Sequence, residues 1–164
     1  MVAKGGVETR FLWRIGTDTP GYTADDMSGT GSKITGGRWN LQGQAMVYCS
    51  SNIALACLET WVHLREGDLP FNRYLVRIEV PEILWQGAAI FDAAAHVGWD
   101  AVPKGMVSIE AGGRFVAEGA SALMRVPSVI VPEEDNVLIN PLHPTSQTIR
   151  AVKVRKWLYD GRMR

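Results

Sequence analysis

Short stretches of alternating or continuously apolar residues recur along the chain, and they predict β-strands with at least one buried face. These stretches cover residues 10–15, 45–49, 74–80, 126–132 and 148–157. Few helical segments are available to connect parallel strands. The pattern therefore predicts an α+β fold of about five or six strands in a mixed or antiparallel central sheet.

Two helices are expected beside this sheet. Ser50, Ser51 and Asn52 offer a cap for a helix whose apolar arc begins at Ile53, and residues 118–125 suggest a second, shorter helix. Loops and turns are predicted at residues 16–37, 82–103, 135–136 and 140–144. A loop as long as the first of these is usually functional or mobile in a compact domain.

The chain has 164 residues, which favours a single domain over residues 1–164 with a core from about residue 10 to about residue 158. The formal net charge is zero, so the composition does not support direct nucleic-acid binding or attraction to an anionic membrane. No apolar run is long enough to span a bilayer, and residues 1–10 lack the apolar core of a signal peptide. Cys49 and Cys57 fit no metal-ligand pattern, so buried thiols in a reducing cytoplasm are expected.

The stretch from residue 35 to residue 66 carries three chemically distinct side chains on successive predicted elements. Arg38 follows paired glycines, Tyr48 lies at the end of a strand, and Glu59 lies on the capped helix. A guanidinium can bind a diphosphate, an aromatic ring can pack on a flat ring, and a carboxylate can stabilise an oxocarbenium-like ribose. The nicotinamide of NAD is cationic and needs no general acid to depart. NAD is thus one of several ligands that these residues allow.

Other chemistries lack their sequence signatures. No Gly-Lys-Ser/Thr ending follows the glycines of residues 29–37, and no strand-GxGxxG-helix unit occurs, so P-loop and Rossmann nucleotide sites are excluded. The histidines are scattered, so no metal site is predicted. Neither a Gly-x-Ser-x-Gly elbow nor a pair of carboxylates around Glu59 is evident.

Two of the candidates also have structural explanations. Arg38 could be a surface charge or a clamp on loop carbonyls. Glu59 could pair with His63, which lies one helical turn further along.

Four further polar or aromatic residues could likewise have a structural role instead of a ligand-binding role. Arg14 could be a solvent-exposed charge on an edge strand, and Ser128 could bond the backbone around it. Trp39 is expected in the core, and Asn40 could cap a turn.

Several segments resemble the RES-domain family, which is named for its Arg, Glu and Ser. The matching positions are Arg38 in GGRWN, Tyr48 in VYCS, Glu59 in ALACLET and Ser128 in VPSVIVP. Supporting features are Arg14 in LWRI, GWDAVP at residues 98–103 and the most specific segment, VPSVIVPEEDNVLINPLHP. Residues 108–115 depart from the polar-to-aromatic stretch expected there, which affects one wall of the pocket but not the core set.

The resemblance implies a fold similar to ADP-ribosyltransferase domains and the NAD-consuming toxin of a bacterial toxin–antitoxin pair. The first expectation is an NAD phosphorylase, which uses inorganic phosphate as co-substrate and yields nicotinamide and ADP-ribose 1″-phosphate. A protein ADP-ribosyltransferase, an NAD glycohydrolase and a catalytically silent partner of an antitoxin are the alternatives. NAD is the substrate in the enzymatic readings, so no separate cofactor is expected.

The resemblance also assigns roles. The catalytic set is Arg38, Tyr48 and Glu59. The NAD-binding set is Arg14, Gly37, Trp39, Asn40 and Ser128. The two arginines would hold the diphosphate or the attacking phosphate, the tyrosine would orient the nicotinamide-ribose, the glutamate would stabilise the ribosyl cation, and the serine would line the pocket. The implied partner is an Xre-type antitoxin that covers the cleft, and a homodimer within that complex is allowed.

Overall fold

The computed structural model describes residues 6–163. Residues 1–5 and 164 lie outside the described residues. They are part of the domain predicted over residues 1–164, and residues 1–5 are also part of the N-terminal segment in which a signal peptide was sought. The elements are β1 (Thr9–Thr17), α1 (Thr30–Thr35), β2 (Val47–Ser50), α2 (Ile53–Trp61), β3 (Arg73–Pro81), α3 (Glu82–Gln86), β4 (Ala89–Ile90), α4 (Met106–Glu118), β5 (Leu123–Pro127), β6 (Asp135–Ile139), η1 (Pro144–Thr148) and β7 (Arg150–Lys156).

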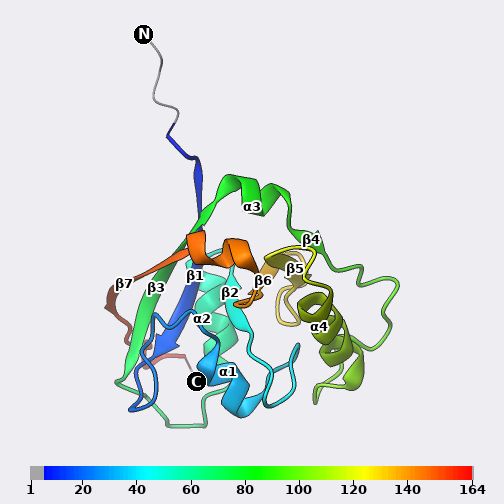
Figure 1. The fold of residues 1–164 in the computed structure, drawn as a ribbon. Coiled ribbons are helices and arrows are strands. Elements are labelled where there is room, and N and C mark those ends of the chain that lie inside the picture. Colours follow the sequence, from blue (N-terminus) through cyan, green and yellow to red (C-terminus); the bar gives the residue numbers. More distant parts are fainter. Residues whose placement is uncertain (1–5, 164) are drawn as a thin grey trace.

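These strands form one sheet in the order β4-β5-β6-β2-β1-β3-β7, with the helices around it (Figure 1). The pair β4 and β5 is parallel, and the other neighbouring strands are antiparallel. The predicted α+β fold with a mixed sheet is therefore confirmed. Among residues 6–163, no helix is both long and apolar enough to cross a membrane.

Several local predictions are confirmed. The strands predicted at residues 10–15, 74–80 and 148–157 correspond to β1, β3 and β7. The expected cap precedes α2, because Oδ1 of Asn52 accepts a hydrogen bond from Leu55 N at 2.8 Å.

The prediction was wrong between residues 106 and 139. Residues 118–125 are not a helix, because α4 ends at Glu118 and β5 begins at Leu123. The strand predicted at residues 126–132 overlaps β5 only at residues 126–127, the last two residues of β5. Residues 135–136 were predicted as a turn, but they are the first two residues of β6. Short elements also interrupt the predicted loops, namely α1, α3 and β4.

A glycine explains why α4 was missed. Gly112 and Gly113 lower the intrinsic helix propensity of this segment. However, a Cβ at residue 112 would lie 1.8 Å from the carbonyl oxygen of Trp39, so only glycine lets the helix approach that backbone. Tertiary packing thus outweighs propensity here.

Helices α2 and α4 cover the same face of the sheet. Trp13 pairs with Ser50, and Ser50 pairs with Asn136, so these three side chains point to one face. The apolar residues of that face form two clusters, one with α4 that includes Leu138, Met46 and Phe115, and one with α2 that includes Ile15, Leu75 and Ala56. The opposite face carries a third cluster that includes Leu12, Val76 and Val137, packed against Ala24 of the loop after β1.

The segment after β7 packs against α2. Tyr159 Oη donates to Thr60 Oγ1 at 2.7 Å, and Trp61 Nε1 donates to the carbonyl of Met163 at 3.3 Å. These two hydrogen bonds hold the helical turn that carries Glu59 against the segment after β7.

Candidate active site

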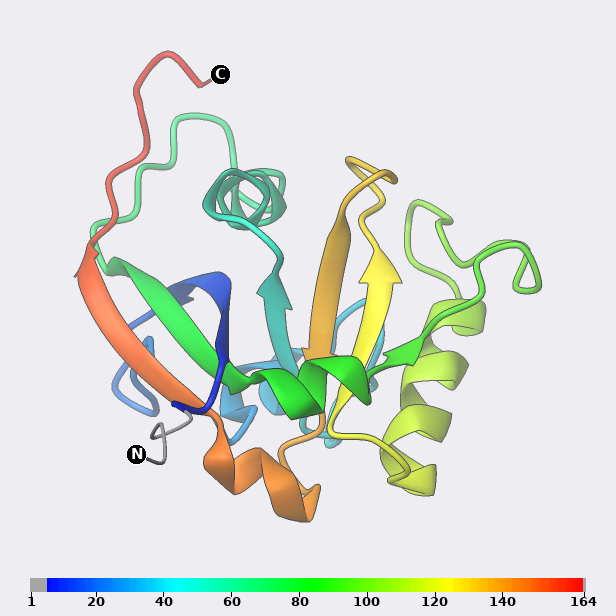
Figure 2. The same cartoon turned by 90° about the horizontal axis from the view of Figure 1, so that it is seen from above.

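Glu59 lies where three segments distant in sequence meet. Its Oε1 accepts hydrogen bonds from Ser128 Oγ at 2.7 Å and from Asn136 Nδ2 at 2.6 Å. In Figure 2, α2 and the connection between β5 and β6 extend beyond the same end of the sheet. The partners of Glu59 are therefore on other elements, and His63 is not one of them. Among the described residues Oε2 has no hydrogen-bond partner, which leaves that oxygen for a ligand.

Ser128 bonds the backbone around it, as one of its two predicted roles requires, and it also contacts Glu59. Its side chain is fully buried in the bend that follows β5, rather than on a strand as predicted. Its Oγ accepts from Ile130 N at 3.0 Å and from Val131 N at 3.1 Å. Because these amides occupy the acceptor side of the hydroxyl, its proton is directed at Glu59.

Asn136 is a site residue that the sequence reasoning missed. Ser50 Oγ donates to Asn136 Oδ1 at 2.7 Å, which fixes the amide so that Nδ2 faces Glu59. The residue was placed in a turn because β6 was not predicted. The available signal was the apolar run at residues 137–139, which continues the strand beyond the polar pair.

Tyr48 is locked onto the glycine-rich loop through its hydroxyl. The hydroxyl donates to Asn40 Oδ1 at 2.5 Å and accepts from Trp39 N at 3.0 Å. Gly37 permits this approach, since a Cβ there would lie 2.6 Å from the Tyr48 oxygen. Burial raises the pKa of Tyr48 above its ordinary value. The hydroxyl is thus neutral and occupied, so only the ring can contact a ligand.

Trp39 and Asn40 are buried, so their side chains serve the architecture of the loop. Trp39 is 3% exposed and packs edge-on against Phe91, with ring centroids 4.8 Å apart. Asn40 is 1% exposed, and its Nδ2 donates to the carbonyls of Ser32 and Gln44. Ligand contacts by either side chain would have to be indirect.

Arg38 joins this loop to the segment before α4. Its Nη1 donates to the carbonyls of Trp99 at 3.2 Å and Ala101 at 2.9 Å, while its own carbonyl accepts from Ser108 Oγ at 2.8 Å. This is the clamp on loop carbonyls that was the structural alternative. Within residues 6–163, Nε and Nη2 of Arg38 have no hydrogen-bond partner, so the guanidinium keeps two groups for an anion.

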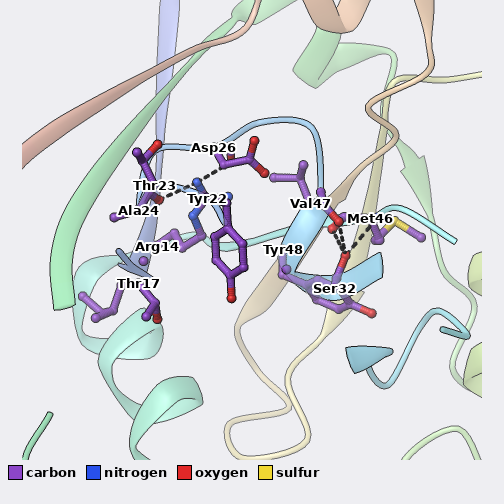
Figure 3. A pocket seen from close by; sticks show the side chains of 14 residues that line it. Arg14, Thr17, Tyr22, Thr23, Ala24, Asp26, Ser32, Met46, Val47 and Tyr48 are labelled. Atoms are coloured by element: carbon purple, nitrogen blue, oxygen red, sulfur yellow. Dashed lines mark hydrogen bonds between the residues drawn. The ribbon is translucent and has the colours of Figure 1, made fainter. Parts of the chain in front are cut away.

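A cavity of about 170 Å³ lies between the second half of β1 and the first half of β2. The two strands are paired only at Trp13 and Ser50, so they separate beyond that point. Arg14 and Tyr48 both line the cavity, together with Tyr22 and Ser32 of the intervening loop (Figure 3). Two sequence candidates are thus brought together around one space.

Arg14 also holds the loop after β1. Its Nη2 donates to the carbonyls of Ala24 at 2.8 Å and Asp26 at 2.7 Å. Burial lowers the pKa of Arg14, but an arginine retains its charge. Its Nε and Nη1 have no hydrogen-bond partner in the described part of the chain, so they remain for a ligand in the cavity.

The cavity and the Glu59 carboxylate are connected through β2. Tyr48 and Ser50 are two residues apart on one strand, so their side chains share a face at a spacing of about 7 Å. Tyr48 contacts the cavity, and Ser50 reaches Glu59 through Asn136. The arrangement offers an elongated ligand an aromatic and cationic subsite at one end and a carboxylate at the other.

Comparisons with known proteins place the chain in a family. The model of the RES domain matches residues 11–160. This chain belongs to the RES-domain family. The RES candidates Arg38, Glu59 and Ser128 all lie within the matched range, and the resemblance seen in the sequence is confirmed.

Several curated RES relatives cover nearly the whole chain. The Prs ADP-ribosylating toxin of a Sphingobium species is 58% identical over 156 residues, which is 94% of this chain and 97% of the relative. A protein named Toxin Res from Pseudomonas putida is 35% identical over 155 residues, covering 93% and 99%. Toxin Res from Yersinia enterocolitica is 30% identical over 146 residues, covering 87% and 93%.

Proposed function

We propose that this RES protein is a toxin that cleaves the nicotinamide–ribose bond of NAD and transfers ADP-ribose to an acceptor. The observation that carries the proposal is the Glu59 carboxylate, whose Oε1 is held by Ser128 and Asn136 while Oε2 lacks a partner in the described chain. A fixed carboxylate of this kind can stabilise positive charge that develops at a neighbouring ribose.

The reaction needs no further catalyst for bond cleavage. The C–N bond to nicotinamide breaks, and its electron pair neutralises the pyridinium ring. The ribose carbon becomes cationic beside Glu59 Oε2. The acceptor then supplies an electron pair to that carbon and gives up its proton, so that nicotinamide and an ADP-ribosylated product result.

Binding of the rest of NAD is assigned to the residues around β2. The free guanidinium groups of Arg38 and Arg14 would bind the diphosphate, and the ring of Tyr48 would pack against the nicotinamide-ribose. These contacts would orient the scissile bond at Glu59.

A protein is the acceptor that the comparisons favour. The relative with 58% identity carries the name Prs ADP-ribosylating toxin, which supports Prs as the acceptor of this chain as well. Inorganic phosphate is the second candidate, as expected from the family resemblance. It is favoured by Arg14, whose Nε and Nη1 could hold a small anion at the cavity.

An antitoxin partner follows from the same relationship. Relatives are named as toxins, which supports pairing with an antitoxin. The Xre type of this antitoxin and a cytoplasmic location of the pair are proposed from the family resemblance. Such a partner would block the entrance to the Glu59 site. Copurification of the two chains, with loss of NAD cleavage in the complex, would test the pairing.

The decisive experiment follows the fate of NAD. Purified protein is incubated with NAD labelled in the adenine part, with and without Prs and with and without phosphate, and the products are separated. Label on Prs supports protein transfer, and a phosphorylated ADP-ribose supports the phosphorylase. Free ADP-ribose alone would show hydrolysis, while absence of nicotinamide under all four conditions contradicts the proposal.

A further inference from the structure

Tyr22 is a partly exposed aromatic residue that packing in the apolar core does not explain. It lies in the loop between β1 and α1 and belongs to none of the three apolar clusters. Within the described chain, its hydroxyl has no hydrogen-bond partner and its ring contacts no other aromatic ring. An aromatic side chain left in this state beside a cavity is a candidate for ligand contact.

The backbone around Tyr22 is held in place. Thr19 N donates to the Tyr22 carbonyl at 2.9 Å, and Thr19 Oγ1 accepts from Tyr22 N at 3.1 Å. The loop is tied to the sheet by Arg14, and Asp18 Oδ1 accepts from Ala24 N at 2.7 Å. The aromatic ring is therefore presented from a fixed turn.

One side of the Tyr22 ring is supported by backbone. A Cβ on Gly31 would lie 3.1 Å from Cζ of Tyr22, so the ring packs closely against this glycine of α1. The ring also lines the cavity between β1 and β2, and Figure 3 shows it projecting into the space between Arg14 and Ser32. Tyr48 lines the same cavity. The space available to a ligand is thus bordered by both tyrosines.

The size of the cavity restricts what it can hold. At about 170 Å³ it is smaller than the roughly 300–1,000 Å³ typical of sites for drug-sized ligands. A dinucleotide would not fit inside, but one heteroaromatic ring would. The remainder of the molecule could extend past Tyr48 toward Glu59.

We propose that Tyr22 is a binding residue that stacks on one heteroaromatic ring of NAD, inside the cavity that it shares with Tyr48 and Arg14. The inference rests on the proposed NAD chemistry and adds a recognition element to it. Stacking on a flat ring needs no hydrogen bond, which agrees with the unpartnered hydroxyl of Tyr22.

The test compares ring-retaining and ring-removing variants of the whole chain. Tyr22→Phe should bind and cleave NAD as wild type does, within about twofold. Tyr22→Leu should raise the NAD dissociation constant and KM about tenfold, with kcat within about twofold, because stacking on an aromatic side chain contributes that order of affinity. Phe71→Leu is the matched control, since Phe71 is 73% exposed and lies outside the cavity.

Two fragments identify the ring. If Tyr22 stacks on adenine, ADP-ribose should inhibit Tyr22→Leu about tenfold less well than wild type, while inhibition by nicotinamide is unchanged; the reverse pattern assigns the nicotinamide. Magnetisation transfer from the Tyr22 ring protons to NAD ring protons, measured on the wild-type protein, gives the same answer if Tyr22→Leu does not fold.

The outcomes separate this inference from the proposed function. Equal NAD affinity in wild type and Tyr22→Leu, or the absence of any magnetisation transfer to bound NAD, overturns the role of Tyr22 alone. A wild-type protein that binds NAD more tightly than Tyr22→Leu but releases no nicotinamide contradicts the proposed function alone. A wild-type protein that does not bind NAD overturns both.

Discussion

The side-chain amide of Asn136 donates a hydrogen bond to Glu59 across 77 residues of sequence, with 2.6 Å between the two atoms. The other end of the same amide accepts from Ser50, so its orientation is fixed. A carboxylate that receives two such bonds on one oxygen is held in one rotamer. The position of the other oxygen, Oε2, is thereby fixed as well.

Replacement of Glu59 by glutamine should lower the rate of nicotinamide release without destabilising the fold. Glu59→Gln keeps the shape and an acceptor oxygen but removes the charge, so nicotinamide release should fall by about 10²–10³-fold with little change in melting temperature. Glu110→Gln, on the exposed side of α4, is the charge-matched control and should be fully active. Wild-type turnover in Glu59→Gln would rule out the assigned role.

Asn136→Asp should change the pH dependence of activity. The substitution places a second carboxylate next to Glu59, and two carboxylates at that distance cannot both be ionised without a large penalty. The acidic limb of the pH–rate profile for kcat should therefore move to higher pH by on the order of one unit. In Ser50→Ala the profile should keep its position while kcat falls modestly. An unmoved acidic limb in Asn136→Asp would argue against direct coupling.

Arg38 should contribute both to NAD binding and to local order. Arg38→Ala removes the bonds to Trp99 and Ala101 as well as the free guanidinium groups. We expect KM for NAD to rise about tenfold, since charge-assisted hydrogen bonds contribute about 1.5–3 kcal/mol. Amide hydrogen exchange at residues 99–101 should accelerate in parallel. Arg114→Ala, an exposed arginine on α4, should change neither quantity.

Adjacent glycines in α4 should respond in opposite directions to alanine. A Cβ at residue 112 would overlap the Trp39 carbonyl, whereas a Cβ at residue 113 would have its nearest contact at 3.8 Å. Gly112→Ala should lower the free energy of unfolding by about 1–3 kcal/mol. Gly113→Ala should raise it by about 0.5–1 kcal/mol through better helix propensity. Urea unfolding of the two variants tests both values, and equal effects would contradict the packing argument.

Alkaline pH should weaken the fold through Cys49. Burial raises the pKa of its thiol from 9.0 to about 12 in the folded chain. Because the folded state holds the proton more tightly, this contribution to stability is complete below pH 9 and is lost as the pH rises toward 12. Cys49→Ala should therefore lose less stability than wild type between pH 9 and pH 11, as measured by urea unfolding. Parallel curves would show that Cys49 does not report on alkaline unfolding.

Local patterns were sufficient for part of the site. The cap at Asn52 lies directly before α2, and the alternation of β1 is continuous, so Glu59 and Arg14 could be placed on the right elements from sequence. Those signals depend on neighbouring residues alone. Arg38 and Tyr48 were singled out by their places after paired glycines and at a strand end, and the family resemblance added a role for Ser128. The contacts of these three residues could not be predicted from either source.

The missed features depend on contacts between distant segments. Asn136 lies on a strand that begins with two polar residues, and its function depends on a partner 77 residues away. Tyr22 acquires its significance only because β1 and β2 separate after one pair, which opens the cavity beside it. Helix α4 was missed because Gly112 is selected for closeness to Trp39, at the expense of propensity.

The contacts of Tyr159 and Met163 with α2 have a consequence for the order of assembly during translation. Residues 157–163 leave the ribosome long after the helix that carries Glu59, so the bonds to Thr60 and Trp61 can form only late in synthesis. Until then the outer side of α2 lacks these two contacts. The helical turn that carries Glu59 therefore gains two of its side-chain contacts from a segment that is synthesised much later than the helix itself.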